Sequence, residues 1–85
     1  MEENGMNYKP HGTCSTMIYF DLDDEKKVHN VHFDNGCNGN LKGIGSLVEG
    51  MDAASVIDRL DGIKCGFKST SCPDQLAKAL KEALA

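Results

Sequence analysis

The sequence predicts a small α+β domain, in which an antiparallel hairpin or three-stranded sheet is followed by helices packed on one face of the sheet. Two observations indicate this fold class. Apolar residues alternate along residues 13–34, as in half-buried strands, and recur at helical spacing from Leu41 onward. In addition, 85 residues suffice for one domain only.

Residues 13–22 and 27–34 are the predicted strands, because β-branched and aromatic residues are frequent in both. The charged residues 23–26 predict a turn, so the strands should pair as an antiparallel hairpin. The apolar side chains that should face the helices are Ile18, Phe20, Leu22, Val31 and Phe33. Residues 1–10 are polar and are predicted to be a flexible segment before a single domain at 11–85.

Three helices are predicted after Gly36. The first carries an apolar stripe from Leu41 to Met51 that includes Gly43 and Gly45. A glycine costs a helix ~1 kcal/mol relative to alanine. We therefore expect both glycines to permit close packing of this helix on the sheet. Asp52 is the predicted N-cap of a short second helix, which closes at Gly62.

A capping box predicts the start of the third helix. Ser71 should accept a hydrogen bond from the first helical turn, and Asp74 should reach back to the cap. Pro73 lies in the first turn, where its missing N–H does no harm. Leucines at four-residue spacing then predict one buried face: Leu76, Leu80 and Leu84.

The four cysteines each lie beside a turn or a helix start, at positions Cys14, Cys37, Cys65 and Cys72. If the helices pack on one face of the hairpin, these side chains should meet at one end of the domain. Four thiolates there would form a tetrahedral zinc site. Two alternatives remain open: a redox dithiol of Cys65 and Cys72, or small buried apolar side chains.

The histidines are weaker ligand candidates. His11 precedes Cys14 closely enough to replace a cysteine as a ligand, but a surface position is the simpler prediction. His29 and His32 should point to opposite faces of a regular strand. They are therefore not expected to share a site.

Composition limits which binding partners and which cellular compartment are expected. The net charge of −4 and the absence of tryptophan argue against a nucleic-acid surface. The first nine residues lack the features of a signal peptide, and no apolar run approaches the ~20 residues of a membrane span. The sequence therefore predicts a cytoplasmic protein with no membrane partner, whose thiols stay reduced.

Segment 70–74, Thr-Ser-Cys-Pro-Asp, spells the signature of the TSCPD domain family. The resemblance extends over nearly the whole chain, through Gly12-Thr13-Cys14-Ser15, Gly36-Cys37 and Cys65-Gly66. The family includes short standalone proteins and a C-terminal domain of adenosylcobalamin-dependent ribonucleotide reductases. The resemblance implies a standalone member that assists nucleotide reduction, with a ribonucleotide reductase or another protein as its partner.

The order of cysteines and elements also resembles iron–sulfur scaffold proteins of the IscU/NifU N-terminal type. This likeness implies an IscU-like fold with Cys14, Cys37 and Cys72 as ligands. Thr16 and Ser71 replace the aspartate and histidine of that family's pattern, and Cys65 is an additional thiol. The predicted function is therefore a zinc-binding, non-catalytic module related to ribonucleotide reductase. An iron–sulfur scaffold or carrier and a thiol-disulfide shuttle using Cys65 and Cys72 are the alternatives.

Overall fold

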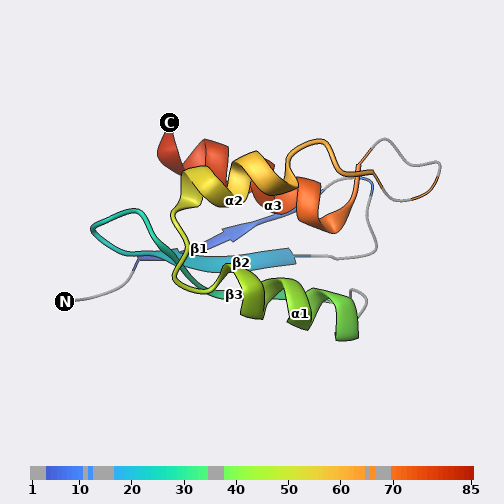
Figure 1. Ribbon diagram of the computed structural model, residues 1–85, viewed down its shortest axis with the longest axis horizontal. Coiled ribbons are helices and arrows are strands. Elements are labelled where there is room, and N and C mark those ends of the chain that lie inside the picture. Colours follow the sequence, from blue (N-terminus) through green and yellow to red (C-terminus); the bar gives the residue numbers. More distant parts are fainter. Residues whose placement is uncertain (1–3, 11, 13–16, 35–37, 65, 67–69) are drawn as a thin grey trace.

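The computed structural model describes residues 4–10, 12, 17–34, 38–64, 66 and 70–85. An antiparallel sheet of order β1-β2-β3 is followed by three helices (Figure 1). The elements are β1 (Asn4–Tyr8), β2 (Met17–Leu22), β3 (Val28–Asp34), α1 (Asn38–Val48), α2 (Ala53–Leu60) and α3 (Cys72–Leu84). The predicted α+β class is confirmed. No helix in these ranges has both the length and the apolar composition needed to cross a membrane.

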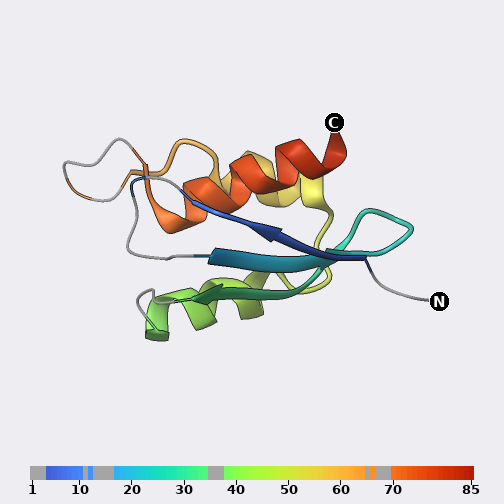
Figure 2. The same ribbon diagram turned by 180° about the vertical axis from the view of Figure 1, so that it is seen from behind.

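One face of β2 supplies the centre of the core. Ile18, Phe20 and Leu22 are buried, whereas Tyr19 between them is 38% exposed. This is the alternation of a sheet that is covered on one side only. Figures 1 and 2 show α2 and α3 side by side along the sheet, and α1 next to β3. The core draws on β2, β3 and all three helices: Ile18, Phe20, Leu22, Val28, Phe33, Leu41, Val48, Ala53, Val56, Cys72, Leu76, Ala79 and Leu80.

Strand β1 differs from the sequence prediction of a loose N-terminal segment. Asn4–Tyr8 pairs antiparallel with β2, and Met6 lies opposite Phe20. Asparagine and glycine are rare in strands, so the local sequence gave little sign of one. β1 is stabilised instead by its pairing with β2 and by the packing of Met6 and Tyr8 against the core.

A β-bulge interrupts β3 at Asn30. Tyr19 lies opposite His32, and Asp21 lies opposite His29. Between these two pairs, β3 has two residues, Asn30 and Val31, where β2 has one, Phe20. Asn30 has φ 57°, a left-handed conformation that asparagine tolerates. The extra residue reverses the alternation. The prediction that His29 and His32 point to opposite faces is therefore wrong, because Tyr19 and Asp21 share a face of β2.

The two glycines inside α1 have different roles. A Cβ on Gly45 would lie 2.9 Å from the carbonyl oxygen of Val31, so this glycine permits close contact with β3, as predicted. A Cβ on Gly43 would meet no atom within 4 Å. For Gly43 the prediction is wrong, since its neighbourhood has room for a side chain.

The segment that joins α1 to α2 is hydrogen-bonded to the start of β3. The Gly50 N–H donates to Val28 O at 2.7 Å, and the Val28 N–H donates to Met51 O at 2.8 Å. The Ala53 N–H donates to Lys26 O at 2.9 Å. Asp52 occupies the predicted N-cap position of α2, although its side chain makes no capping hydrogen bond. These bonds fix the end of α1 and the start of α2 against the β2–β3 turn.

Candidate functional site

The signature residues 70–74 form the start of α3 and its connection to the preceding loop. Ser71 is the N-cap, and its hydroxyl oxygen accepts from the Asp74 N–H at 3.2 Å, as predicted. The same hydroxyl donates to Ile63 O at 2.6 Å. Ser71 therefore links the first turn of α3 to the segment that follows α2.

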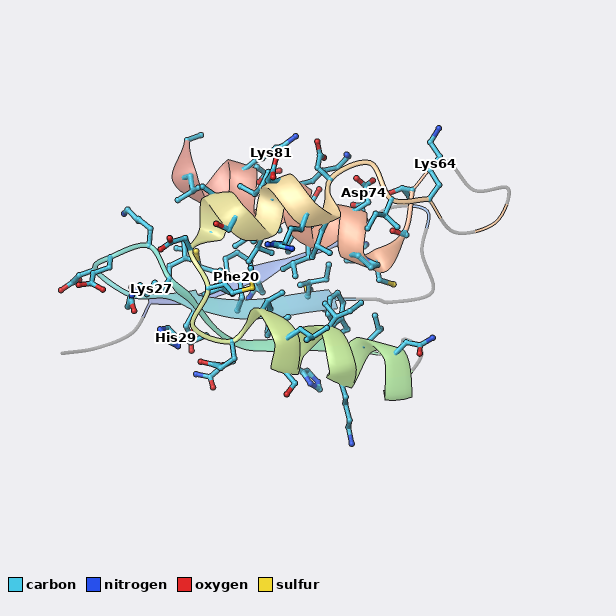
Figure 3. The ribbon with its side chains drawn as sticks, viewed as in Figure 1. Phe20, Lys27, His29, Lys64, Asp74 and Lys81 are labelled. Atoms are coloured by element: carbon cyan, nitrogen blue, oxygen red, sulfur yellow. The ribbon has the colours of Figure 1, made fainter. Side chains whose placement is uncertain are left out.

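Asp74 does not complete a capping box. Its carboxylate accepts instead from the Thr70 hydroxyl, from the Gly62 N–H at 2.6 Å and from Lys78 Nζ at 3.2 Å. The predicted bond back to the cap is replaced because the loop after α2 brings the Gly62 amide within reach. Asp74 is only 2% exposed, so these donors compensate for its burial. Figure 3 shows Asp74 between the start of α3 and this loop.

The hydrogen bonds keep Asp74 ionised. Burial alone would raise the pKa of its carboxyl group, but the donors from Thr70, Gly62 and Lys78 outweigh burial and lower the pKa below 3.8. Thr70 is fixed in turn, since its hydroxyl oxygen accepts from Gln75 Nε2 at 2.8 Å. Asp74 is therefore the centre of a buried network of charge-assisted hydrogen bonds.

An ion-pair layer covers this network on the solvent side. Lys78 Nζ lies 3.2 Å from Asp74 and 3.6 Å from Asp61, and Lys81 Nζ lies 2.9 Å from Asp61. The hydrogen bond to Asp74 raises the pKa of Lys78 above 10.5, and the bond from Lys81 lowers the pKa of Asp61. The layer joins the end of α2 to α3.

Of the four predicted ligands, Cys72 lies within the described residues. It is the first residue of α3 and is 7% exposed. Cys14, Cys37 and Cys65, as well as His11, lie outside the described residues. In the described ranges, no three histidine, cysteine, aspartate or glutamate side chains are grouped as metal ligands would be.

Residues that flank the cysteines do lie together. A Cβ on Gly12 would be 3.1 Å from Thr70 Cγ2, which brings the segment before Cys14 to the segment before Cys72. The bond between Ser71 and Ile63 does the same for the segment before Cys65. Met17, three positions after Cys14, lies opposite Asp34, three positions before Cys37. Figure 1 shows α1 and α3 beginning at the same end of the molecule.

A family profile for the TSCPD domain matches residues 2–84. The chain belongs to the TSCPD domain family. Comparison with curated proteins gives no match, and comparison with solved structures gives none either.

In this TSCPD domain the signature has a structural explanation. The threonine and aspartate form the buried network, the serine caps α3, and the proline lies in the first helical turn. The cysteine begins α3 and is part of the core. Sequence reasoning missed the roles of Gly62, whose N–H donates to Asp74, and Ile63, whose carbonyl oxygen accepts from Ser71. No local pattern marks partners that lie twelve and eight residues away in the sequence.

Proposed function

We propose that this TSCPD domain is a cysteine-rich, non-catalytic module that holds one zinc ion through Cys14, Cys37, Cys65 and Cys72. In this proposal it acts as an accessory in ribonucleotide reduction, with a ribonucleotide reductase or another protein as its partner. Membership of the TSCPD domain family supports the second part. The resemblance drawn from the sequence implies a relation between this family and the C-terminal domain of such reductases.

One observation supports the metal site above all others. Three pairs of described residues draw the cysteine-bearing segments together: Gly12 with Thr70, Ile63 with Ser71, and Met17 with Asp34. Each member of these pairs lies within three positions of a cysteine. A residue spans at most ~3.6 Å of extended chain, so these neighbours limit how far apart the four thiols can lie, which supports the proposal of a shared site.

The chemistry of the donors suits zinc. Four thiolates satisfy the tetrahedral preference of the ion and close the site to water. Such a site also adds folding free energy to a small domain, since the ligands are brought together only in the folded state. The burial of Cys72 argues against the thiol-shuttle alternative, because a shuttle thiolate has to reach a partner's disulfide.

The deciding experiment is the metal content of the full chain, purified without added metal and measured by mass spectrometry of the elements. We expect about one zinc per chain. Serine at any of the four cysteine positions should lower this content, and Lys64→Ser, next to Cys65, is the matched control that keeps all thiols. Bound iron with visible absorbance would instead identify an iron–sulfur scaffold. Metal-free protein with a Cys65–Cys72 disulfide would overturn the zinc site in favour of the shuttle.

The accessory role needs a separate test. The chain would be added to an adenosylcobalamin-dependent ribonucleotide reductase that lacks its own C-terminal domain, and multiple-turnover formation of deoxyribonucleotide would be measured. An increase is expected from the wild type and a smaller one from Cys72→Ser. Unchanged turnover with zinc-loaded protein would refute the accessory role without touching the metal site.

A further inference from the structure

His29, near the start of β3, lies between two carboxylates that come from different elements. Its Nε2 is 2.8 Å from Asp23 Oδ2 in the β2–β3 turn, and its Nδ1 is 2.5 Å from Glu49 Oε2 at the end of α1. The ring is partly buried, with 24% of its side chain exposed. Figure 3 shows His29 at the end of the molecule opposite to Asp74.

This geometry requires a proton on both ring nitrogens. A neutral imidazole carries one N–H and could donate to only one of the two carboxylates. The imidazolium donates to both, and each bond is then charge-assisted. The positions of Asp23 and Glu49 therefore select the charged form of His29.

Backbone amides hold both carboxylates in place independently of the ring. Asp23 Oδ1 accepts from the Glu25 and Lys27 N–H groups, each at 2.9 Å. Glu49 Oε1 accepts from the Asn30 N–H at 2.9 Å. The carboxylates are thus parts of the turn and of the helix end, and the ring is the group that joins them.

Two other charged groups close to the ring, Asp21 and Lys27, have partners of their own. Asp21, opposite His29 in the sheet, accepts from Asn30 Nδ2 at 2.9 Å. Lys27 pairs with Glu25 at 3.4 Å, and its backbone pairs with that of Asp52. Within the described ranges, no lysine or arginine forms an ion pair with Asp23 or Glu49. Neutralisation of His29 therefore leaves two carboxylates facing each other without a cation between them.

We propose that Asp23, His29 and Glu49 form a pH-sensitive clamp, which holds the α1–α2 junction against the β2–β3 turn while His29 is protonated and releases it when the proton is lost. The junction bonds between Val28 and Gly50 and between Val28 and Met51 lie next to the clamp and should weaken with it. What the clamp controls is how firmly the end of α1 is attached to the sheet.

The direction of the pH effect follows from the ionisation of His29. The hydrogen bond with Asp23, followed by that with Glu49, raises its pKa from 6.5 to about 8. A group with a raised pKa in the folded state stabilises fully below its unfolded value. The clamp should therefore be closed below pH 6.5 and lost as the pH rises through 8.

The experiment is a pH series on the full-length chain, with two measurements. Proton NMR of the imidazole ring should give a pKa near 8 for His29 in the wild type and a value moved toward 6.5 in Glu49→Gln. Amide hydrogen exchange should show that the protection factors of Val28 and Gly50 fall as His29 titrates. In His29→Gln these factors should be low and independent of pH.

His32→Gln is the matched control, because His32 is on the same strand, is 65% exposed and pairs with a single carboxylate, Asp34. This variant should keep the wild-type protection at Val28 and Gly50 and its dependence on pH. A His29 pKa at or below 6.5 would overturn the proposal. Protection that stays constant while His29 loses its proton would overturn it as well, because the ring would then titrate without releasing anything.

Discussion

The two ends of the molecule attach their helices through carboxylates in opposite ways. At the start of α3, Asp74 is 2% exposed and receives three donors, from Thr70, Gly62 and Lys78. At the opposite end, Asp23 in the β2–β3 turn and Glu49 just after α1 are more exposed and share one titratable donor, His29. The first attachment uses groups that keep their charge at neutral pH, whereas the second depends on a single proton.

The hydrogen bonds at the two ends therefore differ in how they depend on pH. None of the donors to Asp74 loses its proton near neutrality, since they are a hydroxyl, a backbone amide and a lysine. A histidine is the side chain whose ordinary pKa lies closest to neutral pH. The hydrogen bonds at the end that carries Cys72 should therefore change little near neutral pH, whereas those at the opposite end should change with pH.

Removal of the buried carboxylate should have the largest effect. Asp74→Ala leaves the buried Thr70 hydroxyl and the more exposed Gly62 amide without their acceptor, and a buried donor left unpaired costs about 1–3 kcal/mol. We expect the free energy of unfolding to fall by about 3 kcal/mol, measured by urea denaturation. Asp58→Ala, at an exposed position of α2, is the control and should change stability little. Equal losses in the two variants would contradict the central role of Asp74.

A second change tests the contact that brings Gly12 to the same end. Gly12 has φ 74°, and an added Cβ would lie 3.1 Å from Thr70 Cγ2. Gly12→Ala should therefore destabilise the domain by about 2 kcal/mol, because a left-handed conformation costs a non-glycine residue about 1–2 kcal/mol before any crowding. Thermal unfolding measures the effect. The double variant Gly12→Ala, Thr70→Ser removes the crowding methyl and should recover part of the loss, whereas no recovery would contradict the contact.

Helix α1 connects the two ends, and its glycines should respond with opposite signs. Gly43→Ala meets open space and should stabilise the domain by up to about 1 kcal/mol through helix propensity. Gly45→Ala forces a Cβ to within 2.9 Å of Val31 O and should destabilise it. The two midpoints of urea denaturation give the comparison directly. Equal shifts would show that α1 is not held against β3.

The two ends should also lose stability at opposite limits of pH. The lowered pKa of Asp74 means that its contribution is present above pH 3.8 and is lost as the pH falls through the folded value. The contribution of His29 disappears instead as the pH rises through 8. In melting curves taken across the pH range, Asp74→Asn should flatten the acid limb and His29→Gln the smaller alkaline limb. A variant that flattens the wrong limb would contradict the assignment.

The parts of the fold that depend on local pattern were predictable. Ile18, Phe20 and Leu22 alternate visibly, and Ser71 caps its helix within four residues of sequence. What the sequence could not reveal depends on partners far along the chain. β1 forms because it pairs with β2, although some of its residues rarely occur in strands. Asp74 turns away from its own cap because the loop after α2 presents the Gly62 amide.

The candidate site also has one feature that the sequence predicted and others that it could not reveal. The sequence placed Cys72 at a helix start, and the structure confirms that position. The contact of Gly12 with Thr70 has no local signal, because it joins segments 58 positions apart. The participation of Cys14, Cys37 and Cys65 in one metal site stays a prediction that metal analysis will test.

Because of the bulge at Asn30, the number of residues in β3 decides which side chains lie on the buried face, as their identity does. Val28 and Phe33 are both buried although five positions separate them, which a regular strand would place on opposite sides. Deletion of Asn30 would reduce this separation to four positions, which a regular strand places on one side, so both side chains could stay in the core. Related chains that lack a residue here could therefore keep the same apolar pair in a regular strand. An alignment gap at this position marks the loss of the bulge, and the core packing can remain.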